Sequence, residues 1–251
     1  MNRRVLIVEG PDDLTAVREL ATWLFHARLV PGTLASGGGG QAQKIVLGFD
    51  DHRVEVVSAK GKDNISTLVT TQLGALPPQV EGDSEFTTDV GVVFDPDLDD
   101  PPKEFHSKLV TAVAALKGWS VEGTADESSG WFAVREGSRV RLHSLPWRAP
   151  MDPFDGLGPE QNLDRLMCSI ARSAFPAEAQ KVEAWLNDFP AGAKRSWKSA
   201  MHLWCAVVAS DQSETSAPAQ FLHQNKKCKP VVEDTLQSVR LLEPLRRFLG
   251  A

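Results

Sequence analysis

The chain has 251 residues, of which 42% are hydrophobic and 24% are charged, and its formal net charge is -6. This composition is ordinary for a globular protein and excludes a fibrous or largely disordered chain. The length exceeds that of a typical single domain, so we expect a main domain and a smaller second part. No apolar run approaches the roughly 20 residues that span a bilayer, and the start, MNRRVLIVEG, has too short an apolar run for a signal peptide. We therefore expect neither a membrane segment nor a signal peptide.

The cysteines, the distribution of charge and the absence of tyrosine limit the possible compartment and mechanism. Cys168, Cys205 and Cys228 lie far apart with no CxxC pair, which favours reduced thiols in the cytoplasm over disulfides or a zinc knuckle. Residues 191–251 carry nine Lys and Arg against five Asp and Glu, about +4, which leaves about −10 for the residues before them. The chain has no tyrosine, so it cannot use a catalytic mechanism in which one of its own tyrosines is the nucleophile.

The first 147 residues alternate between short apolar runs and segments with helical periodicity. We expect strands at Val5–Val8, Ile45–Phe49, Arg53–Ser58 and Val90–Phe94, helices at Asp12–Phe25, Ile65–Leu76 and Phe105–Leu116, and a hairpin of Trp131–Arg135 with Arg139–Leu142. This alternation predicts a fold of the α/β class, with a mostly parallel sheet and helices on both of its faces.

The second part of the chain is expected to be mainly helical. A segment rich in proline, glycine and aspartate leads into it, so residues 148–160 are interpreted as a linker between an α/β domain of residues 1–147 and a C-terminal region of residues 161–251. Apolar periodicity in that region predicts helices over residues 161–175, 179–189, 194–209 and 232–249.

Carboxylates follow directly on two of the expected strands. Glu9 follows the first strand, and Asp95 and Asp97 follow the strand that precedes the third helix. Open α/β sheets bind their ligands at the carboxyl ends of strands, so these side chains are candidates for one site. Oxygen ligands of this kind suit Mg²⁺ or Mn²⁺. An isolated acidic pair is also common in turns, and Asp12 and Asp13 can be read as acids favoured by a helix N-terminus, but the combination is stronger than its parts.

The arrangement of these motifs resembles a known family. The segments VLIVEGPDD and VGVVFDPDLDD, with the elements between them, resemble the Toprim domain of topoisomerases, bacterial primases, small ribonucleases and the overcoming-lysogenization-defect (OLD) nucleases. The resemblance implies a Toprim-like (Rossmann-like) fold in which Glu9 takes part in acid/base chemistry and metal binding, while Asp95 and Asp97 hold divalent metal. Asp13 matches a second acidic position of the OLD nucleases, and Asp99 is a further candidate ligand.

Beyond about residue 145 the sequence resembles small standalone Toprim-like proteins of uncharacterised function and the tail of the OLD nucleases. The resemblance implies that Asp164, in GPEQNLDRLM, is a metal ligand and that Lys198 and His202, in WKSAMHLW, contribute from one face of a later helix, with Lys198 stabilising charge on the reacting phosphate. The chain departs from the family pattern at Ala200, where a second lysine is usual. The alternative is a surface lysine at position 198 and a core histidine at position 202.

The resulting hypothesis is a Mg²⁺- or Mn²⁺-dependent endonuclease that hydrolyses phosphodiester bonds of DNA or RNA with one or two ions. The resemblance also implies a separate ATPase chain as a partner, in phage defence. Lys226, Lys227 and Lys229 would bind the phosphate backbone, although they can equally be solvated helix faces. The choice between DNA and RNA, sequence specificity and oligomeric state remain open.

Two alternative functions also remain open. A haloacid-dehalogenase-like phosphatase carries a similar acidic pair, with Asp95 as nucleophile and Asp97 as acid. Asp99 stands where that family has Thr or Val, and Glu9 would have no role in it. A non-catalytic Toprim-like protein that binds nucleic acid or a partner is consistent with the net charge of -6 and with Ala200.

Overall fold

The fold is known from a computed structural model of the chain. It describes residues 3–31, 44–76, 88–96, 102–123, 131–150, 157, 160–188, 196–208, 226–236 and 241–250, without the side chains of residues 102, 103, 235 and 236. None of the helices in these ranges is both long enough and apolar enough to cross a membrane.

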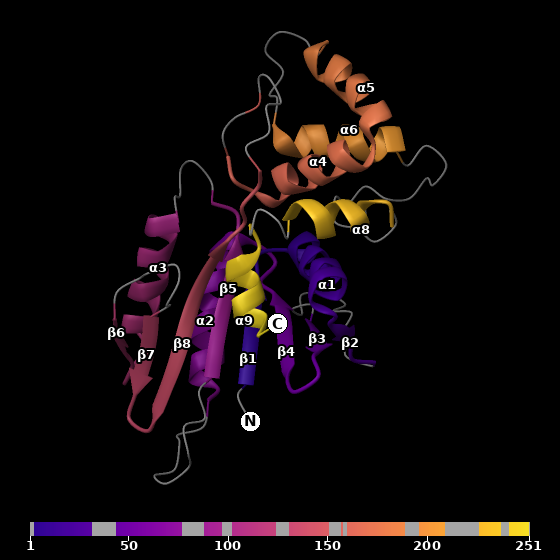
Figure 1. Cartoon of the computed structure of the whole chain (residues 1–251). Coiled ribbons are helices and arrows are strands. Elements are labelled where there is room, and N and C mark those ends of the chain that lie inside the picture. The colour runs from indigo at the N-terminus through magenta and orange to yellow at the C-terminus, as the bar shows by residue number, and fades with distance from the viewer. Residues whose placement is uncertain are drawn as a thin grey trace.

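The described strands form one sheet in the order β2-β3-β4-β1-β5-β8-β7-β6 (Figure 1). Their bounds are β1 Arg3–Val8, β2 Arg28–Leu29, β3 Lys44–Gly48, β4 Arg53–Ser58, β5 Thr88–Phe94, β6 Ser120–Glu122, β7 Trp131–Arg135 and β8 Ser138–Pro146. The central strands β4, β1, β5 and β8 are parallel, whereas the strands outside them pair antiparallel. The α/β prediction is therefore confirmed, with the parallel pairing confined to the four central strands. Short turns join β3 to β4 and β7 to β8, and strands joined in this way pair antiparallel. Strands β2 and β6 were not among the expected elements.

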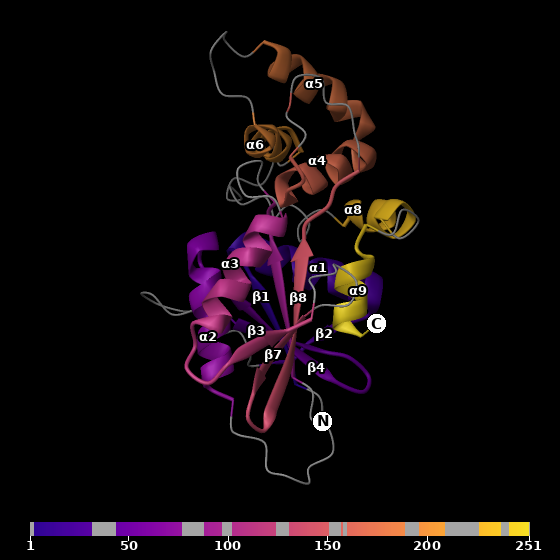
Figure 2. The ribbon, with the colours of Figure 1, turned by 90° about the vertical axis from the view of Figure 1, so that its left-hand side faces the viewer.

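Helices cover both faces of the sheet and then extend beyond one end of it. They are α1 Pro11–Phe25, α2 Ile65–Gly74, α3 Pro102–Ala114, α4 Leu163–Ala174, α5 Pro176–Asn187, α6 Trp197–Val208, α8 Cys228–Val231 and α9 Glu243–Leu249, with short turns η1 Lys62–Asn64 and η2 Val232–Leu236. Helices α2 and α3 lie on one face, and α1 and α9 lie on the other (Figure 2). Helices α4, α5 and α6 lie past the end of the sheet, above it in Figure 1, so the expected helical C-terminal region is confirmed.

The expectation of one continuous helix over residues 232–249 is wrong. Turn η2 ends at Leu236, and α9 begins at Glu243 with Pro244 in its first turn. Proline lacks a backbone N–H and its ring clashes with the carbonyl four residues earlier, so it is tolerated at the start of a helix and not in its interior. The chain therefore enters α9 as a new helix.

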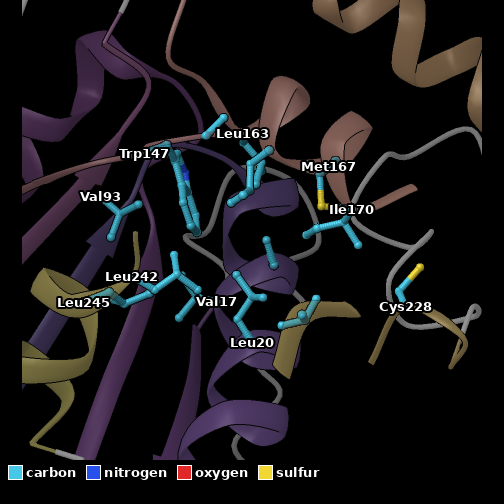
Figure 3. Close-up of a cluster of buried hydrophobic side chains, with 14 of the residues drawn as sticks. Val17, Leu20, Val93, Trp147, Leu163, Met167, Ile170, Cys228, Leu242 and Leu245 are labelled. Carbon is cyan, nitrogen blue, oxygen red and sulfur yellow. The ribbon is translucent and has the colours of Figure 1, made fainter. Parts of the chain in front are cut away.

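The alternation of side chains along β1 divides the core between the two faces. Val5 and Ile7 pack with residues of α2 and α3, and Leu6 and Val8 pack with α1. The cluster on the α1 face is continuous with residues of α4, α6, α8 and α9, and part of it is drawn in Figure 3. Residues 1–147 and residues 161–251 therefore share one hydrophobic core on this face of the sheet, although they are separate along the sequence.

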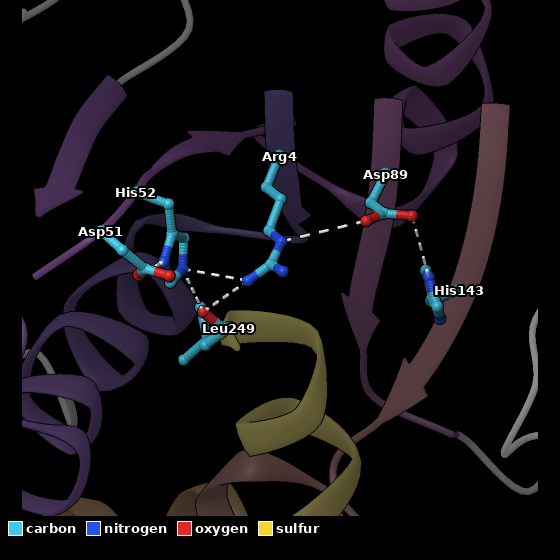
Figure 4. A network of polar contacts seen from close by, with 6 residues as sticks. All are labelled: Arg4, Asp51, His52, Asp89, His143 and Leu249. Atoms are coloured by element: carbon cyan, nitrogen blue, oxygen red, sulfur yellow. Dashed lines mark hydrogen bonds and ion pairs between the residues drawn. The ribbon is translucent and has the colours of Figure 1, made fainter. Parts of the chain in front are cut away.

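Helix α9 returns the chain to the sheet. The ring of Phe248 reaches β5 at Gly91, where an added Cβ would lie 2.9 Å from the Phe248 ring and 2.9 Å from Leu6 Cδ1. At the opposite end of the sheet from α4, Arg4 Nη1 donates to the Leu249 carbonyl at 3.0 Å, and Arg4 Nε lies 3.9 Å from Asp89 (Figure 4). The C-terminal region therefore begins at the carboxyl edge of the parallel strands and ends at their amino edge.

Candidate functional site

Glu9 and Asp95 lie side by side at the carboxyl edge of the sheet. Strands β1 and β5 are adjacent and parallel, with Val8 paired to Val93, so the residue after each strand emerges at the same edge. The backbone N–H of Asp95 points at Glu9 Oε2 with an N···O distance of 3.5 Å. The prediction that these two residues occupy neighbouring strands is confirmed. Asp97 and Asp99 lie outside the described residues.

Asp13 is fixed in the first turn of α1. Gly10 is the N-cap of this helix and Pro11 begins it, which suits the fixed φ of proline. Asp13 Oδ2 accepts the Gly10 backbone N–H at 2.9 Å, and Oδ1 accepts the indole N–H of Trp147 at 2.6 Å. Burial raises the pKa of Asp13 to about 7, with the charge of Glu9 adding to the rise and the Trp147 hydrogen bond opposing it. Asp13 thus has a partner on both oxygens and is not simply a solvated helix-start acid.

Asp95 meets the start of α4. Its Oδ1 accepts the backbone N–H of Leu163 at 2.8 Å. Burial raises the pKa of Asp95 to about 8, and the charges of Asp13, Glu9 and Asp164 raise it further against the effect of the Leu163 hydrogen bond. The carboxyl groups that raise the pKa of Asp95 thus come from the end of β1, from α1 and from α4.

Helix α6 supplies positive groups on the other side of these acids. Burial raises the pKa values of Asp164 and Asp12, and in both cases Lys198 and His202 oppose the rise. Lys198 and His202 are both exposed, so the alternative of a core histidine at position 202 is wrong. Ala200 is fully buried in the core, and a lysine at this position would place a charge among apolar side chains.

The donor chemistry of this edge fits a hard divalent cation. The converging ligands are carboxylate oxygens, which suit Mg²⁺ and Mn²⁺. Within the described ranges, no three His, Cys, Asp or Glu side chains are arranged to hold one ion. Asp95 Oδ1 and both Asp13 oxygens are also engaged by N–H donors. The edge therefore supplies ligands of the right chemistry, although the described side chains are not arranged to hold an ion.

The sequence reasoning missed Trp147 and Lys62. Trp147 follows β8 directly, and β8 is parallel to β5, so its position at the same edge follows from the sheet order. Lys62 follows β4, another central strand, and its Nζ donates to the Asp95 backbone carbonyl at 3.0 Å. The signal for Lys62 was the segment AKGK after an apolar strand, which becomes informative only once β4 is known to flank β1.

The three C-terminal lysines lie away from this edge. Lys226, Lys227 and Lys229 are exposed, and Lys227 Nζ lies 5.8 Å from the centroid of the Phe175 ring, just past the end of α4. Asp164 lies at the start of that helix, whose 12 residues span about 18 Å at 1.5 Å per residue. Lys227 thus stands about one helix length from Asp164.

Comparisons with known proteins bear on the fold alone. No protein-family model matches the chain, and no curated protein matches it. Among solved structures, it is similar to the hypothetical protein PH0156 from Pyrococcus horikoshii OT3, with a TM-score of 0.61, 20% sequence identity and coverage of 100% of both chains. An integron cassette protein from the mobile metagenome of V. cholerae has a TM-score of 0.17 and 12% identity over 57% of this chain and 94% of its own. The first likeness shows that another protein shares this fold over its whole length.

Proposed function

We propose that the protein is a Toprim-type nuclease that uses Mg²⁺ or Mn²⁺ to hydrolyse phosphodiester bonds of DNA or RNA. The observation that supports this most directly is the electrostatic coupling among Glu9, Asp13, Asp95 and Asp164 at the carboxyl edge of the sheet, with Lys198 near enough to lower the pKa of Asp164. Convergence of acids from distant parts of the chain is unfavourable for the metal-free fold, because like charges disfavour ionisation of their neighbours. A bound cation would offset that cost.

The positions of the residues suggest a separate chemical role for each of them. Glu9, Asp95, Asp13 and Asp164 would hold the cation, with Asp97 and Asp99 as further ligands. The cation would polarise the phosphate and lower the pKa of a bound water. Glu9 would exchange a proton with the reacting water, and Lys198 would stabilise negative charge on the phosphate. Trp147 would keep Asp13 directed into the site.

Two further parts of this proposal concern the setting. The partners would be DNA or RNA and a separate ATPase chain, and the compartment would be the cytoplasm. The three cysteines support a reducing compartment, because all of them are buried as free thiols.

A non-catalytic role is the second candidate, and a specific observation favours it. Asp95 Oδ1 is held by the Leu163 N–H, so a cation has to displace this hydrogen bond or bind through the other oxygen. A protein that only binds nucleic acid or a partner could retain such an arrangement. The phosphatase alternative is less favoured, because it leaves the coupling of Glu9 and Asp13 to Asp95 unused.

The deciding experiment replaces both aspartates of the acidic pair. Asp95→Asn with Asp97→Asn is expected to abolish Mn²⁺-dependent nicking of supercoiled plasmid and cleavage of labelled RNA. The matched control is Asp188→Asn with Asp234→Asn, which removes the same charge at two exposed positions and is expected to cut normally. Equal cleavage by both double variants would exclude this site as the catalyst. Wild-type hydrolysis of p-nitrophenyl phosphate without nicking would favour the phosphatase, and no hydrolysis of either substrate would favour the non-catalytic role.

A further inference from the structure

The loop between β4 and α2 is fixed against the end of β1. The backbone N–H of Ala59 donates to the Val8 carbonyl at 2.8 Å, and that of Gly61 donates to the Glu9 carbonyl at 2.8 Å. These bonds continue the pairing of β4 with β1 past the last residues of the strands. The loop is therefore joined directly to the backbone of a candidate site residue.

The backbone of this loop is shaped to turn toward β5. Lys60 has a φ of 58° and Gly61 a φ of 128°, and such angles are rare for residues with a side chain. Glycine adopts the second of them without strain. The Asn64 side chain donates to the Lys60 carbonyl at 3.3 Å, and the Lys60 N–H donates to the buried Ser58 hydroxyl at 3.3 Å. These contacts fix the direction in which Lys62 leaves the loop.

Lys62 spans the end of β1 to reach the residue that follows β5. Strand β1 separates β4 from β5, so the distance to be crossed is about 10 Å at the usual strand spacing. Lys62 Nζ donates to the Asp95 carbonyl at 3.0 Å and lies 5.7 Å from the centroid of the Phe105 ring. That ring stacks on Phe94 at a centroid distance of 4.0 Å. Lys62 thus links the loop after β4 to the backbone of Asp95, whose N–H points at Glu9 and whose pKa is raised by the charges of Asp13 and Glu9.

We propose that Lys62 is a positioning residue of the candidate metal centre, whose ammonium group holds the backbone carbonyl of Asp95 so that Asp95 stays beside Glu9. The inference rests on the proposed function, because it assigns a role within that site. It distinguishes Lys62 from Lys198, which would act on the phosphate. A residue that orients a metal ligand typically changes metal affinity by about 10-fold to 100-fold when it is replaced.

If Lys62 is only a nearby positive charge, Lys62→Met should change the Mn²⁺ affinity in the opposite direction. Removing a cation near a metal site strengthens the binding of Mn²⁺, because like charges repel. Removing a positioning contact weakens it. The sign of the change in affinity therefore separates the two roles.

The experiment compares Lys62→Met, Lys62→Arg and Lys60→Met in the full chain. Lys60 is exposed in the same loop, so Lys60→Met is matched in charge and location. Mn²⁺ affinity is measured by calorimetry, nicking gives kcat and KM, and thermal melting confirms that each variant is folded. Lys62→Met is expected to weaken Mn²⁺ binding about 10-fold or more and to lower kcat. Lys62→Arg should retain most of the Mn²⁺ affinity and most of kcat. Lys60→Met should change neither quantity by more than about twofold.

Each other outcome overturns a defined part of the proposals. Unchanged or tighter Mn²⁺ binding by Lys62→Met, or an equal loss in Lys60→Met, overturns the role of Lys62 alone. A wild-type chain that binds no Mn²⁺, or whose binding survives Asp95→Asn, overturns the metal centre and Lys62 with it. A third outcome is that Lys62→Met loses Mn²⁺ binding while the wild-type protein does not nick DNA. This result supports the positioning role of Lys62 and overturns the proposed nuclease activity.

Discussion

The indole N–H of Trp147 donates to Asp13 Oδ1 at 2.6 Å, in a buried hydrogen bond between residues 134 positions apart. It joins the end of β8 to the first turn of α1, and Trp147 belongs to the same buried cluster as Leu242 and Leu245 (Figure 3). The C-terminal helix α9 thus supports the residue that holds a candidate ligand.

Trp147→Phe is expected to destabilise the fold. It keeps a ring in the core but leaves Asp13 Oδ1 without this donor, and an unsatisfied buried polar group costs about 1–3 kcal/mol. The free energy of unfolding from urea titration at pH 7 measures the loss. Trp185→Phe is the control, because Trp185 is 49% exposed and its replacement should change stability by less than about 0.5 kcal/mol. Equal stabilities of the two variants would contradict a stabilising role for this hydrogen bond.

The metal-free protein is expected to lose stability as the pH rises from about 4 to about 8. The pKa values of Asp13 and Asp95 are raised from 3.8 to about 7 and about 8, so over this window the folded chain binds more protons than the unfolded chain. The free energy of unfolding then falls with pH, by up to about 1.4 kcal/mol per pH unit for each proton. Denaturation in EDTA across the window measures the slope.

Asp95→Asn serves as the comparison for this pH dependence. Burial lowers the pKa of His106, which gives a slope of opposite sign near pH 6, but that contribution is common to both proteins and cancels in the difference. The free energy of unfolding of the variant is expected to fall less steeply with pH, and the variant should be more stable than the wild type at pH 8. Parallel curves for the two proteins would show that Asp95 titrates normally.

Gly91→Ala is expected to loosen the docking of α9. The new Cβ would lie 2.9 Å from atoms of both Leu6 and Phe248, and overpacking of this kind costs about 1–3 kcal/mol. Gly74→Ala is the matched control, since nothing lies within 4 Å of a Cβ at that helical position and alanine favours the helix by about 0.5–1 kcal/mol. Urea denaturation should move the two variants in opposite directions, and a stabilised Gly91→Ala would show that the sheet and α9 can separate at no cost.

Replacing Lys226, Lys227 and Lys229 by Gln is expected to weaken nucleic-acid binding and to make it less dependent on salt. For duplex DNA each lost phosphate contact reduces the slope of log affinity against log salt by about 0.9. Anisotropy titrations over a salt series with Ca²⁺ in place of Mg²⁺ measure both quantities without cleavage. The control replaces Lys108, Lys117 and Lys181, which are exposed elsewhere. If both triple variants change alike, the C-terminal lysines act through net charge and form no binding surface.

The sequence by itself determined the central strands β1 and β5 and the carboxylates that follow them. The apolar runs ending at Val8 and Phe94 were sufficient to place β1 and β5, because a buried strand needs continuous apolar residues on both faces. Their parallel pairing then brings Glu9 and Asp95 to one edge, as expected. Patterns of this kind are local and repeat with the period of the backbone, so they can be read without knowledge of the packing.

Only the tertiary structure decided which residues surround those acids. Trp147 and Lys62 reach the edge because β8 and β4 flank the two central strands, and sheet order is not written in the period of any one segment. The position of Lys227 beside Phe175, one helix length from Asp164, likewise depends on how α8 packs against α4. Long-range contacts are selected by the fit of apolar faces across the whole chain, which is why the sequence indicated the carboxylates and the fold supplied their partners.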